Sequence, residues 1–353
     1  MTKPVNPIAV THLPAADGIR GLACLIVLIM HGLSLGWPEQ LFPLLKGGGK
    51  YGVWLFFVLS AFLLTLRLSN RGFSGGSLAD YALGRTLRIM PLFVFACVLY
   101  AWSDVGIQNI EQLRSVLLLQ SGSIHLWTVP VEYKAYFVLP LLVWAGVRLQ
   151  RRLGNGALAL AALAAVLAQQ AAWPYWNTPA DSPNTRWYLA PFIFGTFCAL
   201  MLPWLSKRRR GTLGTIFALF TFIILVLALP GPRQALLGGE LANDLMDKHV
   251  FIGLWWAVFI ALLIDGHGLV GRMLSHRLLA YLGTISYSTY LFHWLIMVKV
   301  FALFPNNPLA FAAAQIMAIG AGSLGYHLAE VPLEHLRRRI TPINQRSRFS
   351  ATR

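Results

Sequence analysis

The stretch "DGIRGLACLIVLIMHG", residues 17–32, is as apolar as a membrane-spanning helix except for three ionisable side chains. Asp17 and Arg20 stand near its start, and His31 stands near its end. A charged side chain inside a span costs on the order of 2.5–3.5 kcal/mol on insertion scales, so each one is a functional candidate. Arg20 and His31 are eleven residues apart. This spacing is close to three helical turns, which puts both on one helix face, about 16 Å apart along the axis.

The composition of the whole chain is that of a membrane protein. Of its 353 residues, 57% are hydrophobic and only 12% are charged, whereas about a quarter of the residues of a soluble domain are charged. The predicted fold class is therefore all-α, a polytopic bundle of about ten transmembrane helices of about 20 residues each. The predicted spans are 18–37, 51–68, 87–103, 130–147, 156–172, 187–204, 211–229, 249–265, 278–303 and 307–329.

We expect a single transmembrane domain over residues 1–340, because the chain shows no clear internal repeat and no linker that would separate two domains. The tail, residues 341–353, is basic and is expected to be disordered on the cytoplasmic side. The start of the chain lacks the pattern of a cleavable signal peptide, so the first span is expected to be retained. The cysteines are expected to be core residues and not metal ligands, because all three lie in apolar stretches: Cys24, Cys97 and Cys198.

The net charge of +16 is distributed as in a protein that follows the positive-inside rule. If the N-terminus is cytoplasmic, most basic residues fall inside, and the longest polar stretches fall outside, at 104–129, 173–186 and 230–248. This asymmetry predicts an even number of spans with both termini in the cytoplasm. The run "SKRRRG" at 206–211 lies between two spans and is expected to anchor the topology at the lipid bilayer. A nucleic-acid partner is therefore not expected.

Two more titratable residues lie inside predicted spans, at a depth similar to that of His31. Glu132 enters the fourth span from outside, and His293 in "YSTYLFHW" reaches the outer half of the ninth. If these helices are neighbours, the three groups meet at one level, where His31 could act as a general base and Glu132 could orient it. For each histidine the alternative is a structural hydrogen bond between helices. Glu132 could instead be an ion partner of Lys134 or of an arginine.

The segment "GRTLRIMPL" places Arg85 and Arg88 one helical turn apart at the start of the third predicted span. Two forked guanidiniums suit the oxygens of a phosphate. The alternative function of this pair is anchoring at the membrane surface.

These motifs, in their order, resemble membrane acyltransferase family 3, the multi-span enzymes that O-acylate bacterial surface glycans. The opening stretch is similar to the family's Asp-Gly-Leu-Arg-Gly followed by an intramembrane His, and "YGVWLFFVLSAFLLT" at 51–65 resembles its second span. "RTLRIMPL" resembles its Arg-rich third entry. "HLWTVPVEYKAYFVLPLL" carries the family's Trp and Glu, "LGTISYSTYLFHW" its Ser-Tyr-Ser-x-Tyr-Leu-x-His, and "AEVPLEHL" its closing Glu-x-Pro. The positions carried over from these last three motifs are Trp127, Glu132, Tyr287, Tyr290, His293 and Glu330.

Some positions depart from the family pattern. Trp54 stands where the family usually has Asp, and Ala61 where it has Gly. "TVP" at 128–130 replaces Ser-Leu-Ser, and Tyr133 and Lys134 replace Glu-Gln. These changes surround Glu132 and leave its role open.

The resemblance implies an acyl-CoA donor, most often acetyl-CoA, and no permanently bound cofactor or metal. The implied acceptor is a hydroxyl of a surface polysaccharide, a lipopolysaccharide or a lipid-linked glycan, and the implied location is the bacterial cytoplasmic (inner) membrane. We expect Arg20, Arg85 and Arg88 to bind the donor. His31 and Glu132 are the expected catalytic residues, and His31 could be a general base or a transient acyl carrier. The expected supporting residues are Asp17, Trp127, Tyr287, Tyr290, His293 and Glu330.

Two other classes of function stay open at this point. A lipid-glycan transporter or flippase could use the same buried ionisable residues, whereas a non-catalytic membrane scaffold would need none of them.

Overall fold

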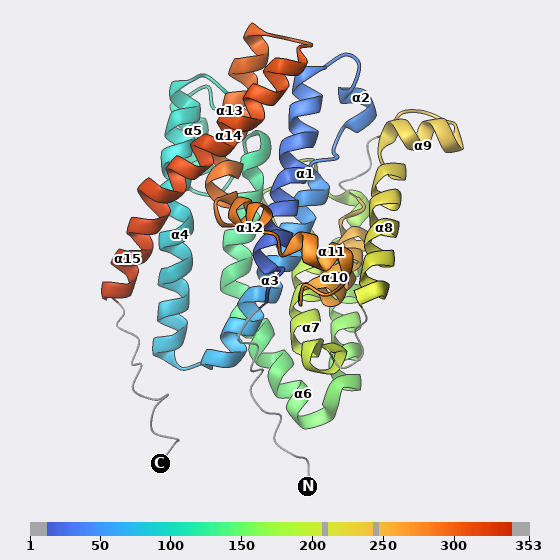
Figure 1. Ribbon diagram of the computed structural model, residues 1–353. Coiled ribbons are helices and arrows are strands. Elements are labelled where there is room, and N and C mark those ends of the chain that lie inside the picture. The colour runs from blue at the N-terminus through green and yellow to red at the C-terminus, as the bar shows by residue number, and fades with distance from the viewer. Residues whose placement is uncertain (1–12, 207–210, 243–246, 341–353) are drawn as a thin grey trace.

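The computed structural model describes residues 13–206, 211–242 and 247–340, and all regular structure in these ranges is helical. Long helices run side by side and form one bundle (Figure 1). They are α1 (Ala16–Gly36), α3 (Lys50–Arg71), α4 (Gly75–Trp102), α6 (Thr128–Ala172), α7 (Leu189–Ser206), α8 (Gly211–Leu227), α10 (His249–Leu263), α13 (Ser286–Leu303) and α14 (Pro308–Gly325). The shorter helices are α2 (Phe42–Leu45), α5 (Ile110–Leu117), α9 (Pro230–Leu237), α11 (Gly268–Leu274), α12 (Arg277–Thr284) and α15 (Val331–Ile340). Single turns are η1 (Ile124–Trp127), η2 (Tyr175–Asn177), η3 (Thr185–Tyr188) and the π-helical η4 (Tyr326–Glu330).

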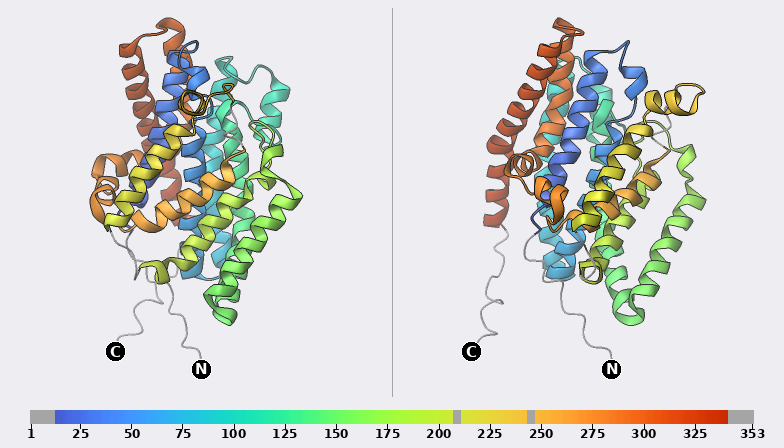
Figure 2. Two further views of the ribbon diagram at one scale, coloured as in Figure 1. Left: turned by 90° about the vertical axis from the view of Figure 1, so that its right-hand side faces the viewer. Right: turned by 45° about the vertical axis from the view of Figure 1, so that its right-hand side comes forward.

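The described helices qualify the chain as a multi-pass membrane protein. Six of them are long and apolar enough to cross a membrane, and the count reaches eight if the bent pairs α8–α9 and α10–α11 are each one span. The difference from the predicted ten lies in two elements. Helix α6 counts once although it breaks at Gly154, where φ is 83° and its two legs fold back on each other (Figure 2). Helix α13 is not counted, because Ser, Tyr, His and Lys side chains lower its hydropathy.

The count of ten and the cytoplasmic termini therefore stay predictions. The predicted anchor at 207–210, the tail at 341–353 and the first twelve residues lie outside the described ranges.

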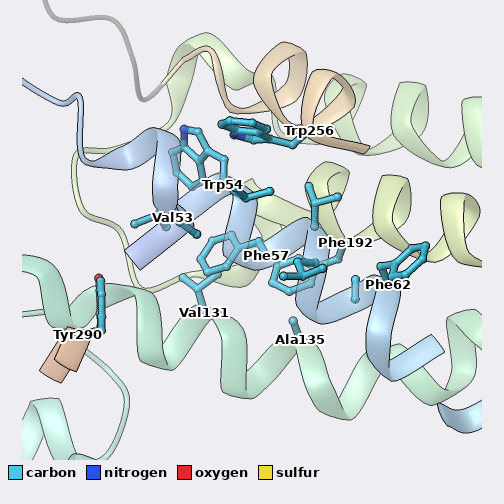
Figure 3. Close-up of a cluster of buried hydrophobic side chains, with 14 of the residues drawn as sticks. Val53, Trp54, Phe57, Phe62, Val131, Ala135, Phe192, Trp256 and Tyr290 are labelled. Atoms are coloured by element: carbon cyan, nitrogen blue, oxygen red, sulfur yellow. The ribbon is translucent and has the colours of Figure 1, made fainter. Parts of the chain in front are cut away.

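Helix α3 lies at the centre of the bundle and carries an aromatic core. Trp54, Phe57 and Phe62 of α3 are fully buried against Phe192 of α7 and Trp256 of α10 (Figure 3). The indole N–H of Trp256 donates to the backbone carbonyl of α3 residue Tyr51 at 2.9 Å. Since lipid tails are as apolar as these side chains, close packing and not exclusion from water holds the helices together here.

Helices α1 and α12 approach each other through glycines. A Cβ at Gly283 would lie 1.8 Å from the carbonyl oxygen of Asp17, and one at Gly21 would lie 2.0 Å from that of Leu279. Only glycine fits at such a crossing, as is common between membrane helices. The contact holds α12 against the segment of α1 that carries Arg20.

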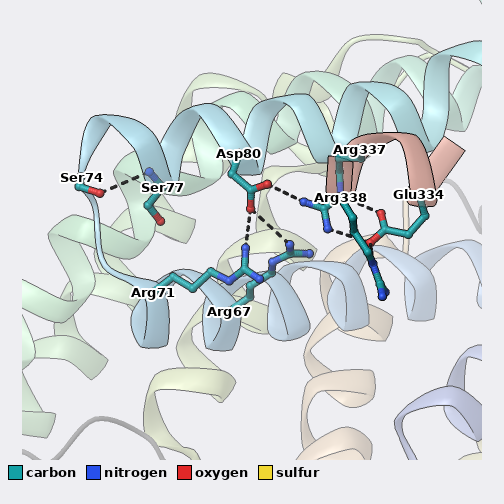
Figure 4. Close-up of polar contacts among 8 residues, drawn as sticks. All are labelled: Arg67, Arg71, Ser74, Ser77, Asp80, Glu334, Arg337 and Arg338. Atoms are coloured by element: carbon teal, nitrogen blue, oxygen red, sulfur yellow. Dashed lines mark hydrogen bonds and ion pairs between the residues drawn. The ribbon is translucent and has the colours of Figure 1, made fainter. Parts of the chain in front are cut away.

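An ion cluster joins α3, α4 and α15 (Figure 4). Asp80 of α4 is at its centre and is almost completely buried. One carboxylate oxygen accepts from Arg71 at 2.5 Å and lies 3.7 Å from Arg67, and the other accepts from Arg337 at 2.5 Å. Arg337 also binds Glu334, which in turn pairs with Arg338. We call these six residues the Asp80 cluster.

We predict that Asp80→Asn destabilises the protein by about 3 kcal/mol, since it removes the almost completely buried carboxylate that joins Arg71 of α3 to the buried Arg337 of α15. Thermal unfolding of the purified protein in detergent would measure the change. The matched control is Arg338→Gln, which breaks a pair whose side chains are 68% and 42% exposed and should cost less than about 1 kcal/mol. Equal effects of the two substitutions would contradict a structural role for the cluster.

Candidate active site

A cavity of about 100 Å³ lies between α1, α3, α4, α6 and α13. Its ionisable lining residues are Arg20, Arg85, Arg88 and Glu132, with the tyrosines Tyr136, Tyr287 and Tyr290. The remaining lining residues are Val53, Phe56, Phe57, Ser60, Leu63, Ile89, Thr128, Val129 and Ser286. The structure therefore brings the three predicted arginines to one cavity.

The arginines of the cavity differ in their partners. Arg20 donates to Asp17, one of the expected supporting residues, at 2.8 Å. In the part of the chain that the structure describes, neither Arg85 nor Arg88 pairs with a carboxylate, and Arg85 lies over the ring of Tyr136. Two guanidiniums that are not paired with a carboxylate in an apolar bundle have the chemistry to bind an anion such as a phosphate.

Glu132 lies in this cavity and not beside the histidines. Its carboxylate accepts a hydrogen bond from Ser60 at 2.6 Å and a second from Tyr136, one turn along α6. Within the described ranges no hydrogen bond or ion pair joins it to His31, His293 or Lys134. The expectation that Glu132 meets both histidines at one level is therefore not met, and its alternative pairing with Lys134 is not seen either.

His31 and His293 do meet, although they lie 262 residues apart. His31 Nδ1 is 2.8 Å from His293 Nε2, and the two rings are nearly parallel. His293 is fully buried, and its Nδ1 lies 2.7 Å from the carbonyl oxygen of Tyr290. The sequence predicted a similar depth for the two residues, and the structure shows that the helices carrying them are neighbours.

The hydrogen bonds assign the tautomers of both rings. A carbonyl oxygen only accepts, so the Nδ1 of His293 carries a proton and donates to Tyr290. Burial disfavours a charged imidazolium, so the Nε2 of His293 has a lone pair and accepts from the Nδ1 of His31. The Nε2 of His31 is left with a lone pair. It faces Gly49, where a Cβ would lie only 2.7 Å away.

A third histidine, His125, was not among the predicted residues. It lies in η1 and is buried, with its ring centroid 4.7 Å from that of His293 and 6.5 Å from that of His31. Neither ring nitrogen has a hydrogen-bond partner among the described residues. In the sequence, His125 stands two residues before Trp127, and this is the signal that points to it. The sequence analysis places the segment 104–129 in an outer loop, away from the histidines inside the spans.

The two tyrosines predicted as supporting residues line the cavity, and Tyr290 also packs against His125 and His293. The hydroxyl of Tyr290 donates to the carbonyl of His125 at 2.7 Å and accepts from Thr128 at 2.8 Å. Its side chain therefore contacts both the cavity and two of the imidazoles. Tyr287 lines the same cavity and donates to the carbonyl of Ile89 at 2.7 Å.

Trp127 and Glu330 support the site from outside the cavity. Trp127 is buried against Trp54 and Tyr188, with ring centroids 6.0 Å and 5.2 Å away. The buried Glu330 of η4 accepts a hydrogen bond from Ser288 of α13. Neither residue lines the cavity, so both are placed as packing residues of the helices that form it.

Comparison with known proteins gives a match over most of the chain. The acyltransferase 3 family model, described as an acyltransferase domain, matches residues 13–327. A Bacillus subtilis (strain 168) protein provisionally described as peptidoglycan O-acetyltransferase YrhL is 25% identical over 371 aligned positions, 91% of this chain and 55% of the relative. Peptidoglycan O-acetyltransferase OatA of Listeria monocytogenes (serovar 1/2a, strain EGD-e) is 24% identical over 333 positions, 80% of this chain and 49% of the relative.

The chain thus spans about half the length of the curated relatives it matches. No solved structure matches it. The family match covers the cavity, the three histidines and every predicted site residue except Glu330. The chain therefore belongs to the acyltransferase 3 family.

Proposed function

We propose that this chain is an integral-membrane O-acyltransferase of the bacterial cytoplasmic membrane. It moves an acyl group, most simply acetyl, from acyl-CoA on the cytoplasmic side to a hydroxyl of a surface glycan. The observation that supports this best is the cavity itself, in which Arg85 and Arg88 lack acidic partners and which ends at Tyr290 beside the histidines. The two relatives are named for peptidoglycan, and we propose a glycan of that class as the acceptor.

The donor binds with its phosphates at the three arginines. Its pantetheine arm then follows α1 over the about 16 Å from Arg20 to His31. Tyr290 lies on this path, so its hydrogen bonds to Thr128 and His125 must open to admit the thioester. Glu132 stays on the donor side, where Ser60 and Tyr136 hold its carboxylate.

The chemistry takes place at the Nε2 lone pair of His31. In direct transfer this nitrogen takes the proton of the acceptor hydroxyl while the hydroxyl oxygen attacks the thioester carbon. The C–S bond breaks, and His31 returns the proton to the departing thiolate. In the alternative route Nε2 attacks the thioester carbon, the C–S bond breaks and CoA leaves as the thiolate, so His31 carries the acyl group as an acyl-imidazolium. The acceptor hydroxyl then attacks the acyl carbon, the C–N bond breaks, and the proton of the hydroxyl passes to the thiolate. Both routes require the Nδ1 proton to be held by His293.

We predict that His31→Ala lowers acyl transfer by at least about 100-fold, the usual contribution of a general base. The assay follows labelled acetyl from acetyl-CoA into glycan in membrane vesicles. The matched control, His327→Ala, removes an exposed histidine of η4 and should leave activity unchanged. If the folded His31→Ala protein still acylates the glycan, the assignment of His31 is wrong.

We predict graded effects at His293, which positions His31 and does not touch substrate. His293→Gln keeps an oxygen that can accept the N–H of His31 and should retain part of kcat, whereas His293→Phe removes the acceptor and should lose most of it. KM for acetyl-CoA should stay near its wild-type value in both variants. A purely structural role would instead make both variants unstable and equally inactive.

We predict that Arg85→Gln and Arg88→Gln each raise KM for acetyl-CoA by roughly tenfold, because each removes a charge-assisted contact to phosphate. Turnover at saturating donor should change less. Arg151→Gln removes an exposed arginine at the α6 turn and serves as the control for general loss of positive charge. An unchanged KM in both cavity variants would rule out this donor site.

A further inference from the structure

The Asp80 cluster carries more positive than negative charge. Four arginines share two carboxylates, those of Asp80 and Glu334. Asp80 holds Arg71 and Arg337 at 2.5 Å each, but its nearest oxygen is 3.7 Å from Arg67. Arg67 is therefore the loosely held member, and its side chain is 29% exposed. Figure 4 shows Arg67 and Arg71 pointing from α3 toward the same carboxylate.

Arg67 also continues the wall of the cavity. Ser60 and Leu63 of α3 line the cavity, and Arg67 is the next residue on that face, four positions beyond Leu63. One turn corresponds to about 6 Å along the helix. Arg67 therefore extends the positive charge of the cavity toward the end of α3.

We propose that Arg67 binds the 3′-phosphate on the adenosine ribose of the CoA donor and so makes the enzyme prefer CoA over 3′-dephospho-CoA. The proposal rests on the donor site of the proposed function. CoA carries its diphosphate and its 3′-phosphate on the same ribose, at the end of the molecule far from the thioester. If Arg85 and Arg88 bind the diphosphate within the cavity, the 3′-phosphate can extend along α3 from Leu63 toward Arg67, about one turn further.

The other arginines of the cluster fit this role less well. Arg71 is held at 2.5 Å by Asp80, and Arg337 is buried between Asp80 and Glu334. Arg338 is on α15 and pairs with Glu334. Arg67 can turn to a phosphate while Asp80 keeps Arg71 and Arg337, so binding leaves no carboxylate without a partner.

The test measures binding of CoA and of 3′-dephospho-CoA to the full chain in detergent, by calorimetry. We expect the wild-type protein to bind CoA about tenfold more tightly, as one charge-assisted contact predicts. Arg67→Gln should bind both ligands with similar affinity, and Arg67→Lys should keep part of the preference. Arg71→Gln, which removes the neighbouring charge on the same helix, should keep the full preference. Thermal unfolding of each variant would show that it is folded.

Each outcome supports or overturns the proposal. A preference that is lost in Arg67→Gln and kept in Arg71→Gln supports it. Equal affinity of the wild-type protein for the two ligands, or a preference that survives Arg67→Gln, overturns it and leaves the CoA site of the proposed function intact. If both glutamine variants lose the preference for CoA over 3′-dephospho-CoA, the preference comes from the overall positive charge, and the specific role of Arg67 is overturned. If neither ligand binds to the wild-type protein, the donor site fails and this proposal fails with it.

Discussion

The constraint on which this structure depends is the absence of water from the membrane interior, which makes a buried charged group costly unless it finds a partner in the bundle. Asp80 pairs with guanidiniums from two other helices, and Glu132 accepts hydrogen bonds from the hydroxyls of Ser60 and Tyr136. Among the described residues, no carboxylate pairs with Arg85 or Arg88. In such an environment, cations without acidic partners indicate where an anionic ligand belongs.

The same constraint shapes the histidine pair. A carboxylate often orients a catalytic histidine in soluble enzymes, but it would add a buried charge here. In this protein the orienting group is a second neutral imidazole, His293, which is itself held by the carbonyl of Tyr290. This series of hydrogen bonds runs from the carbonyl of Tyr290 through His293 to His31, and none of its members carries a net charge. A neutral chain of this kind costs less to bury than an ion pair.

Trp54 shows how one departure from the family pattern is absorbed by the structure. The resemblance places an Asp at this position, but here an indole is fully buried and lies near Trp127, Tyr188 and His249. The position therefore contributes to aromatic packing around α3 and adds no charge to the cavity. Trp127, which the motif suggested as a site residue, is part of the same packing.

The sequence by itself determined the all-helical membrane class and the family, and it predicted the depth and the shared helix face of Arg20 and His31. These properties follow from hydropathy and from the 3.6-residue period, which are local. The tertiary structure decided which helices are neighbours, because packing between distant segments has no local signal. It alone paired His31 with His293, brought His125 beside them and placed Glu132 among the arginines. It also decided that Arg67, one turn from the cavity wall, is held more loosely than the arginines around it.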